Sequence, residues 1–359
     1  MSAAPTETGA PWAAPRRTVR LLGERVSGRI GTRTPWVGAG LLLLVGVAAT
    51  AGLLTGNGDI APGTTLRIVA GDYSGVTAFE VLAVLDIRLP RVLCAVLAGW
   101  AFGVSGAMFQ ALTDNPLGSP DVIGFTSGAA TGAVVALLVA ASWVSSAMLG
   151  ALLGGLLTAV AVYWLSWRGG VAGYRLILVG IGVTAVLGSV RAFLISRAEL
   201  GEAAAAYRWL VGSLSGRSWD DIGPLLLGTV VLVPLTLACL RPLERIGAGA
   251  DLARALGLAL EPNRALIMVV GTAWCAVAVA AAGPVGFVAM AAPQLVRRIT
   301  RAPGPHVVTA GLFGALLLVL ADLLGMWVVR PAQLPAGIAT AVLGGLYLIW
   351  LLNRERRAL

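Results

Sequence analysis

Lysine is absent from this chain of 359 residues, and charge of either sign is scarce. Only 12% of the residues are charged, whereas soluble domains carry roughly a quarter. All 26 basic residues are arginine. A phosphate-binding loop of the GxxxxGK[ST] type needs a lysine, so the chain cannot hold that ATP site despite its 47 glycines.

Residues that could hold a metal ion or perform catalysis are also few. Cys94, Cys239 and Cys275 lie far apart in apolar stretches, and no CxxC pair exists. His306 is the only histidine and stands beside Pro305 at the start of an apolar segment. We expect packing cysteines, a structural histidine, no metal site and no catalytic residue, which argues against an intramembrane enzyme.

Apolar sequence is what the chain has in abundance. Hydrophobic residues make up 58% of it, and uncharged runs of about 20 residues recur, the length that crosses a bilayer as a helix. We therefore expect an all-α polytopic membrane protein with about ten transmembrane helices. The expected segments lie near 35–54, 92–112, 122–140, 143–166, 174–195, 222–240, 264–282, 284–296 (interrupted by Pro293), 306–328 and 336–352.

These segments predict a single transmembrane domain over residues 35–353. Residues 1–34 carry six arginines and are expected to form a flexible basic segment, and residues 354–359 a short tail. An arginine pair before an apolar run also occurs in cleaved export signals. The first run is too long for a typical signal core, however, and no good small-x-small cleavage site follows it.

The arginines predict the orientation. Ten crossings place both termini on one side of the membrane, where the termini and loops hold eighteen arginines against seven on the other side. Arg191 lies within a segment and completes the count. Because arginine is enriched in cytoplasmic loops, we expect both termini in the cytoplasm and the RLPR sequence at 88–91 on the outer face.

The longest expected cytoplasmic loop, about 241–264, contains a short amphipathic helix. Leu252, Ala255, Leu256 and Ala259 share one apolar stripe, on a stretch too short to cross the membrane. Such a helix could lie on the membrane surface, or it could dock into a groove of a soluble partner. The spacing does not distinguish the two.

Two charges fall inside the expected segments. Arg191 could attract an anionic solute in a transport pathway, extend to the membrane surface, or pair with Glu199 or Glu202. Asp322 is expected to have a structural, hydrogen-bonded role. An ion-coupled secondary transporter remains an alternative, although it would need more converging charges than these two.

Several blocks resemble one known family. The stretch from RLPRVLCAVLAGWAFG to TSGAATGA resembles the hallmark region of the FecCD family of ABC importer permeases, which serve iron-siderophore and vitamin B12 uptake. YRLILVGIG, WLVGSLSGRSWDD, ADLARALGL, GPVGFVAMAAPQLVRRITR and ADLL…LPAGIATAVLGGLYLIWLL resemble later blocks in the same order. The resemblance covers roughly residues 80–355. AAPQLVRR, with Gln294 where many members have histidine, is closer to the ferric-siderophore branch than to the cobalamin branch.

The resemblance implies a type II ABC importer permease fold in the bacterial cell (inner) membrane. It implies a second permease subunit, identical or related, two cytoplasmic ATPase subunits that bind ATP and Mg, and an external siderophore-binding protein. This chain itself would bind no cofactor and no nucleic acid, and would contact membrane lipid. Transport of cobalamin or heme by a permease of the same family remains an alternative.

The resemblance also implies three sets of site residues. Arg88 and Arg91 match arginines that dock the binding protein, unless they only extend to the membrane surface. Arg330 is expected to replace a basic residue that relatives often carry at the position of Met326. The remaining residues are Gly249, Asp251, Ala253, Arg254, Leu256 and Gly257 of the ATPase-coupling helix, and Arg168, Gly169, Gly170, Gly173, Gly182 and Arg191 of the pathway and gate.

Overall fold

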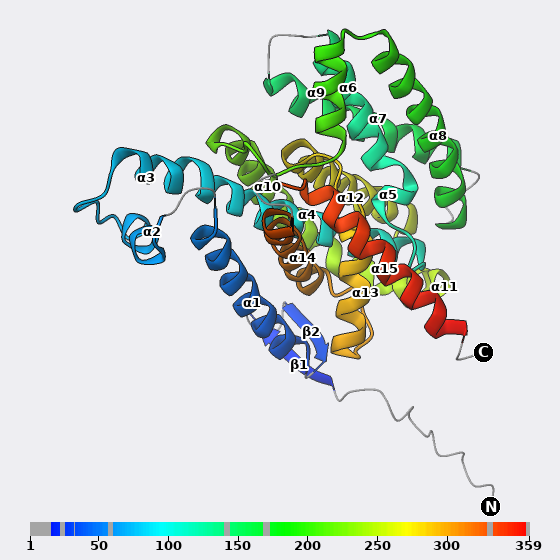
Figure 1. The fold of residues 1–359 in the computed structure, drawn as a ribbon. Coiled ribbons are helices and arrows are strands. Elements are labelled where there is room, and N and C mark those ends of the chain that lie inside the picture. The colour runs from blue at the N-terminus through cyan, green and yellow to red at the C-terminus, as the bar shows by residue number, and fades with distance from the viewer. Residues whose placement is uncertain are drawn as a thin grey trace, which may run out of the picture.

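The computed structural model describes residues 16–21, 26–31, 33–56, 60–139, 144–167, 173–328 and 333–356. The chain forms a helical bundle around a central helix, α4 (Figure 1). The long helices are α1 (Thr34–Leu54), α4 (Leu89–Thr113), α6 (Phe125–Val139), α7 (Val144–Ser166), α8 (Gly173–Arg197), α10 (Trp219–Gly247), α12 (Leu260–Ala282), α13 (Val288–Thr300), α14 (Val307–Val328) and α15 (Ala336–Arg356). The short ones are α2 (Pro62–Val69), α3 (Ala78–Leu82), the π-helix η1 (Ala83–Arg88), α5 (Pro120–Ile123), α9 (Leu200–Leu210) and α11 (Ala250–Ala255).

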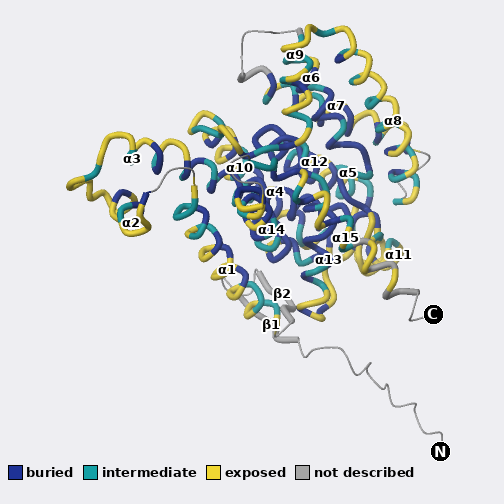
Figure 2. Tube along the Cα trace, viewed as in Figure 1, coloured by how far each residue is buried: buried dark blue, intermediate teal, exposed yellow. Residues whose placement is uncertain are grey.

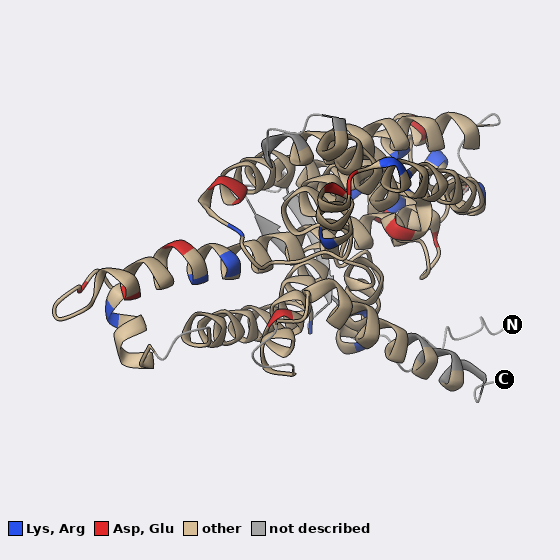
Figure 3. Cartoon of the chain, turned by 45° about the horizontal axis from the view of Figure 1, so that its top comes forward, with Lys and Arg blue, Asp and Glu red and all other residues tan. Residues whose placement is uncertain are grey.

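The expected polytopic helical fold is confirmed. Within the described ranges, seven helices are long and apolar enough to cross a membrane: α1, the continuous α3–η1–α4, α7, α8, α10, α12 and α14. α6 and the Ala336–Tyr347 part of α15 are also apolar, and α13 has 13 residues. Each of the ten expected segments thus falls on a helix. Few positions along the helices are charged residues (Figure 3).

Two short strands precede the first helix. β1 (Arg16–Leu21) and β2 (Val26–Gly31) pair antiparallel, with Arg16 opposite Gly31 and Leu21 opposite Val26. They lie within the basic segment 1–34, for which the sequence predicted no regular structure.

Burial is concentrated in three helices. The most apolar stretch of α3–η1–α4 is 78% buried inside the chain, that of α12 72% and that of α14 61%, whereas that of α8 is only 11% buried. Figure 2 shows this contrast between the dark centre and α8 at the edge. α4, α12 and α14 therefore form a densely packed core, and α8 keeps a largely apolar surface for lipid or another chain.

Small residues allow the core helices to approach closely. A Cβ on Gly99 of α4 would lie 2.6 Å from the carbonyl oxygen of Gly314 in α14, which is too close for any larger residue. Gly132 of α6 and Gly150 of α7 meet backbone to backbone in the same way. Because lipid gives no hydrophobic drive for helix association, close contacts of this kind stabilise the bundle.

The eighth expected segment differs in detail from the prediction. Residues 283–287 (GPVGF) are not helical, and α13 begins only at Val288. Gly283 has φ +75°, and Pro284 has no N–H to donate. Pro293, expected to interrupt the segment, instead lies inside α13. In a regular helix the carbonyl of Ala289 would accept from the N–H of residue 293, which a proline lacks. This carbonyl instead lies close to the backbone of Gly106 in α4.

An arm extends from one end of the bundle. It consists of α2, α3 and η1 and has its own small core, formed by Ile60, Ile68, Ala83 and Val84 (Figure 1). The arm continues directly into α4, so that residues 78–113 form one helix of 36 residues. At 1.5 Å per residue this helix is roughly 54 Å long, against about 30 Å of hydrocarbon in a bilayer. We call this the arm end of the bundle and the opposite one, where α11 lies, the α11 end.

Candidate functional sites at the two ends of the bundle

The RLPR sequence lies where the π-helix meets α4. In this wide turn the N–H of Leu89 donates to the carbonyl of Val84, five residues back. The same pattern would pair the carbonyl of Leu85 with the N–H of residue 90, but Pro90 has none. The indole Nε1 of Trp219, at the start of α10, donates to Leu85 O instead, at 3.1 Å. The proline therefore leaves an acceptor that anchors α10 to the arm.

Arg88 binds the end of another helix. It is buried, with 5% of its surface exposed, and its Nη1 donates to the carbonyl oxygen of Leu53 at 3.2 Å. Leu53 is in the last turn of α1, where carbonyls have no partner within the helix and a cation is favourable. A Cβ on Gly56 would collide with this guanidinium, so the small residue gives Arg88 access to α1.

Arg91 pairs with Asp322 of α14. Its Nε donates to Oδ2 and its Nη2 to Oδ1, both at 2.8 Å, and the side chains are 12% and 5% exposed. This two-bond geometry is the strongest arrangement that an arginine and a carboxylate can adopt. The expected structural, hydrogen-bonded role of Asp322 is confirmed, and the pair joins the arm ends of α4 and α14.

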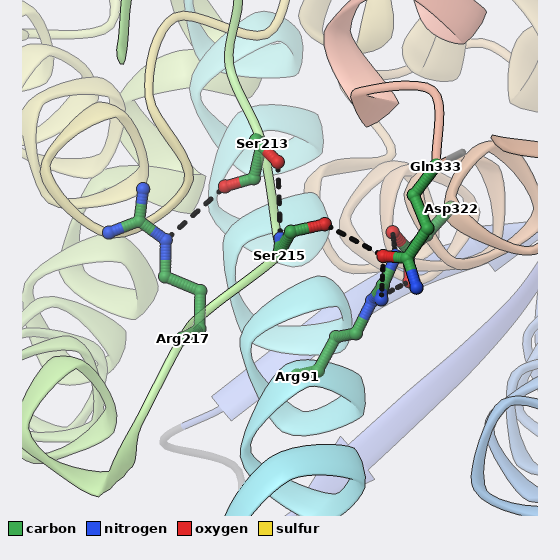
Figure 4. Close-up of polar contacts among 6 residues, drawn as sticks. All are labelled: Arg91, Ser213, Ser215, Arg217, Asp322 and Gln333. Carbon is green, nitrogen blue, oxygen red and sulfur yellow. Dashed lines mark hydrogen bonds and ion pairs between the residues drawn. The ribbon is translucent and has the colours of Figure 1, made fainter. Parts of the chain in front are cut away.

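A glutamine extends this ion pair to two loops. The Nη1 of Arg91 donates to Gln333 Oε1 at 2.8 Å, and the hydroxyl of Ser215 donates to the same oxygen at 3.0 Å (Figure 4). Ser215 belongs to the α9–α10 loop (residues 211–218) and Gln333 to the α14–α15 loop. We call Arg91, Asp322, Gln333 and Ser215 the arm-end cluster.

The α9–α10 loop also contains Arg217, which contacts residues close to it in sequence. The Nε of Arg217 donates to the carbonyl of Ser213 at 3.2 Å (Figure 4). Its Nη1 lies 3.3 Å from Oδ1 of Asp221. These contacts order the loop beside the arm-end cluster.

The docking residues are thus held by partners in the chain itself. Arg88 contacts α1, Arg91 contacts α14, and Arg330 lies outside the described residues. Met326, whose place Arg330 is expected to take, is buried in α14. Docking of an external protein by these arginines stays a prediction.

At the opposite end, α11 forms the expected short helix. It follows Gly249, whose φ of +117° favours glycine, and is followed by Gly257 at φ +75°. Asp251 and Arg254 form an exposed ion pair at 2.8 Å. Ala253 is fully buried and holds the helix to the bundle. All four residues of the predicted apolar stripe are exposed; they are Leu252 (51%), Leu256 (58%), Ala255 and Ala259.

The residues expected at the pathway fall along α8 and before it. Gly173 begins α8 and packs against the backbone of Thr113, and a Cβ on Gly182 would meet nothing within 4 Å. The Nη1 of Arg191 donates to the carbonyl of Ser127 at 2.8 Å and to Thr131 Oγ1 at 3.0 Å, both in α6. The structure shows no carboxylate partner for Arg191 in the part of the chain that it describes. Arg168, Gly169 and Gly170 lie outside the described residues.

A second buried polar cluster, at the α11 end, was not predicted. Gln110 of α4 donates to the carbonyl of Met290 at 2.9 Å and accepts from Arg297 at 3.3 Å. Gln294 donates to the carbonyl of Pro116 at 2.6 Å and accepts from Tyr347 of α15 at 3.3 Å. These bonds connect α4, α13 and α15 to the turn after α4. Their only sequence signal was glutamine within apolar runs.

No metal centre is apparent among the described residues, where no group of three or more His, Cys, Asp or Glu side chains could hold an ion. The three cysteines are buried, as packing residues should be. Among the described residues, the polar contacts at the two ends join helices and loops of the chain to one another.

Comparison with known proteins identifies the family of this bundle. The model of the FecCD transport family matches residues 41–354. The ferric enterobactin transport system permease protein FepG of Escherichia coli is 39% identical over 88% of this chain and 96% of its own length. The achromobactin transport system permease protein CbrC of Dickeya dadantii is 35% identical, over 88% and 90%.

A solved structure has the same fold. It is an inward-facing conformation of a metal-chelate type ABC transporter, with a TM-score of 0.74 at 24% identity, over 89% of this chain and 99% of that one. The family match and the two relatives each extend over most of the chain, well beyond any single motif. This multi-pass membrane protein therefore belongs to the FecCD transport family.

Proposed function

We propose that the chain is the permease subunit of an ABC importer that carries a ferric siderophore across the bacterial cell (inner) membrane. The observation that carries this proposal is the 39% identity, over 88% of the chain, to a ferric enterobactin permease. The achromobactin permease supports the same class of cargo. Cobalamin and heme remain alternative cargoes, and the uptake experiment below separates them.

In this proposal the arm end faces outward and the α11 end faces the cytoplasm. Figure 1 places α11 and the C-terminal end of α15 at the same end of the bundle. Four of the arginines predicted to be cytoplasmic lie there, at the end of α10, in α11 and at the start of α12: Arg241, Arg245, Arg254 and Arg264. The excess of arginine there supports a cytoplasmic location for it and for both termini.

Two separate ATPase subunits supply the energy, and α11 is where one of them docks on this chain. The exposed stripe with Leu252 and Leu256 has no partner within the described chain, which suits insertion into a groove of a soluble protein. Gly249 and Gly257 bound the helix with backbone conformations that glycine favours. ATP and Mg bind to those subunits, because a chain without lysine has no GxxxxGK[ST] loop.

A siderophore-binding protein docks at the arm end. Arg91 uses three of the five N–H donors of its guanidinium within the chain and keeps 12% of its side chain exposed, which supports a further contact there. Arg88 is buried against α1, so its contribution to docking is to fix the position of the arm. Arg330 remains the third candidate for this contact.

A second permease subunit, identical or related, packs beside this one. α8 supports this arrangement because only 11% of its most apolar stretch is buried in the chain, and it carries the exposed Leu178, Ile181 and Val186. Gly182 lies on this open surface. The translocation pathway then runs along α8, with Gly173 at its cytoplasmic start and Arg191 bridging α8 to α6.

The ion-coupled alternative gains no support from the geometry. A proton-coupled carrier needs an intramembrane carboxylate that can release and rebind a proton. Asp322 is instead held by two charge-assisted hydrogen bonds from Arg91. Both carboxylate oxygens of Asp322 are thus engaged in a contact that joins α4 and α14.

Uptake into proteoliposomes tests the proposal. The permease is reconstituted with its ATPase and binding protein, and vesicles are offered ferric enterobactin, a ferric hydroxamate, cobalamin and heme, with ATP or a non-hydrolysable analogue inside. We expect ATP-dependent uptake of one of the ferric siderophores. Uptake driven by a proton gradient without ATP would contradict the proposal, and uptake of cobalamin or heme alone would correct the cargo.

A further inference from the structure

Arg298 and Trp350 meet on the surface of the bundle at its α11 end. Arg298 is in the last turn of α13, and its Cζ lies 5.1 Å from the centroid of the Trp350 ring in α15. This distance is within the range of a cation–π contact. Both residues are exposed, Trp350 to 48%. The contact therefore holds a positive charge at the surface, between two helices.

The same two helices are joined one turn further into the bundle. The hydroxyl of Tyr347 donates to Gln294 Oε1 at 3.3 Å, and the ring of Tyr347 lies 5.9 Å from that of Trp350. Gln294 and Arg298 are four positions apart on α13, and Tyr347 and Trp350 are three apart on α15. Each pair therefore occupies one face of its helix, and the two faces oppose each other. This alignment positions the Trp350 ring, and with it the guanidinium of Arg298.

The positive charge at this place has no acidic partner. Arg301, at the C-cap of α13, is a second exposed arginine three positions on. Over the ranges that the structure describes, neither Arg298 nor Arg301 forms an ion pair. The neighbouring Arg297 instead donates to Gln110 in α4. The C-terminus of a helix carries only about half a negative charge, so the two exposed arginines leave a net positive charge that an anion would balance.

An exposed apolar stripe leads away from this charge along α15. Its residues are three or four positions apart and therefore lie along one side of the helix, over about 12 Å. Ile299 of α13, beside Arg298, is exposed as well. We call the α15 residues the α15 stripe; they are Val342, Leu343, Leu346, Ile349 and Trp350.

Trp350 indicates the level of this surface in the bilayer. Tryptophan side chains concentrate where the hydrocarbon meets the lipid headgroups. α15 begins at Ala336, and Trp350 lies about 21 Å further along its axis, which is most of the depth of the hydrocarbon. The sequence becomes polar from Asn353 on. The guanidinium beside Trp350 is therefore at the level of the headgroups, and the rest of the α15 stripe is at the level of the acyl chains.

We propose that Arg298, Arg301 and Trp350 form a binding site for one anionic phospholipid, whose headgroup phosphate contacts the two arginines and whose acyl chain lies along the α15 stripe. Basic sites between transmembrane helices at the cytoplasmic side suit such headgroups, and the proposed orientation places this site in the cytoplasmic leaflet. Inorganic phosphate has the same charge but no chain, so only the lipid matches both parts of the surface. The site goes beyond the proposed importer function, because it requires neither cargo nor ATPase.

Titration of the full-length permease with lipid tests the proposal. The protein is purified in detergent, stripped of lipid and mixed with phosphatidylglycerol or phosphatidylcholine, and native mass spectrometry measures the affinity of the first bound lipid. We expect phosphatidylglycerol to bind about tenfold or more tightly than phosphatidylcholine. Arg298→Gln should weaken the binding of phosphatidylglycerol by about fivefold, the factor that one arginine at a membrane surface contributes. Arg298→Lys keeps the charge and should retain most of this affinity.

The controls separate a lipid site from a structural contact. Arg208→Gln, at an exposed arginine of α9, should bind phosphatidylglycerol as the wild type does. Trp350→Leu keeps the stripe apolar and removes the ring, and we expect about threefold weaker binding. Phosphatidylcholine should bind all these variants equally, which shows that they are folded. Equal affinity of Arg298→Gln and the wild type for phosphatidylglycerol would overturn the site.

Two further measurements identify the ligand. A large excess of inorganic phosphate should leave phosphatidylglycerol bound, and displacement by phosphate would show that the arginines bind a free anion. Arg298→Gln should retain the ATPase in a pull-down. Loss of the ATPase with unchanged lipid affinity would assign the surface to the ATPase and overturn the proposal. No siderophore enters these assays, so their failure is distinct from failure of the uptake experiment.

Discussion

Arg91 and Asp322 are 231 positions apart in the chain and meet through two hydrogen bonds of 2.8 Å. Both side chains are largely withdrawn from solvent: that of Arg91 is 12% exposed and that of Asp322 is 5% exposed. A buried charge that loses its partner keeps its desolvation cost, and this makes the pair a sensitive point of the structure.

Replacing Asp322 by Asn should therefore destabilise the protein. The variant leaves Arg91 without its counter-charge, and we expect a loss of about 3 kcal/mol, seen as a lower temperature of unfolding in detergent. The exchange variant Arg91→Asp/Asp322→Arg should recover part of the loss. An Asp322→Asn protein as stable as the wild type would show that the pair contributes nothing to the fold.

Substitutions on the exposed stripe of α11 should impair coupling and leave the fold intact. Leu252→Asp and Leu256→Asp alter side chains that are 51% and 58% exposed, and we expect them to weaken ATPase binding by about tenfold or more. Pull-down of the ATPase and siderophore-stimulated ATP hydrolysis measure the effect. Leu66→Asp, the same exchange at a leucine of α2 that is 54% exposed, is the matched control. Unchanged binding in both leucine variants would remove α11 from the interface.

The effect of a Gly→Ala substitution on stability should depend on the space around the glycine. A Cβ on Gly106 would collide with the carbonyl of Ala289, whereas a Cβ on Gly182 would meet nothing within 4 Å. We expect Gly106→Ala to cost about 1–3 kcal/mol through overpacking and Gly182→Ala to leave stability unchanged. Thermal unfolding of the two variants in one detergent provides the comparison, and equal unfolding temperatures would contradict the close approach of α4 and α13.

The single histidine should make stability depend on pH. Burial lowers the pKa of His306, a hydrogen bond with the carbonyl of Ala302 partly opposes this, and Arg297 lowers it further. The unfolded chain then binds a proton at higher pH than the folded one does. The stabilisation is complete above about pH 6.5 and is lost as the pH falls from there toward the lowered value. His306→Asn, which tolerates the φ of +46°, should remove this part of the pH dependence of thermal unfolding. An identical pH dependence in the variant would show that other groups cause it.

The helices could be predicted because their signal is local. Ten apolar runs were visible in the sequence, and each falls on a helix. This holds both for the buried α4 and for α8, which is mostly exposed, because both helices are apolar. The start of α13 was predicted wrongly because residues 283–287 are as apolar as a helix would be. Their departure from helix depends on Gly283 and Pro284, while Pro293 is accommodated by the close approach of Gly106 to Ala289.

The contacts of the candidate sites were less predictable, for a physical reason. A stripe on α11 is visible because its residues are three or four positions apart. Nothing local connects Arg91 to Asp322, or Gln333 to Ser215, across more than a hundred residues. The sequence therefore indicated which residues carry charge at the arm end, and only the fold shows that they bind one another.

Pro90 shows how an interruption in one helix can set the position of another. Because residue 90 offers no N–H, the oxygen of Leu85 remains available and receives the indole of Trp219. A different residue at position 90 would bring its own N–H toward that oxygen, which two donors would then share. The N–H that Pro90 lacks therefore leaves the oxygen of Leu85 to Trp219, and with it a polar contact between the arm and α10.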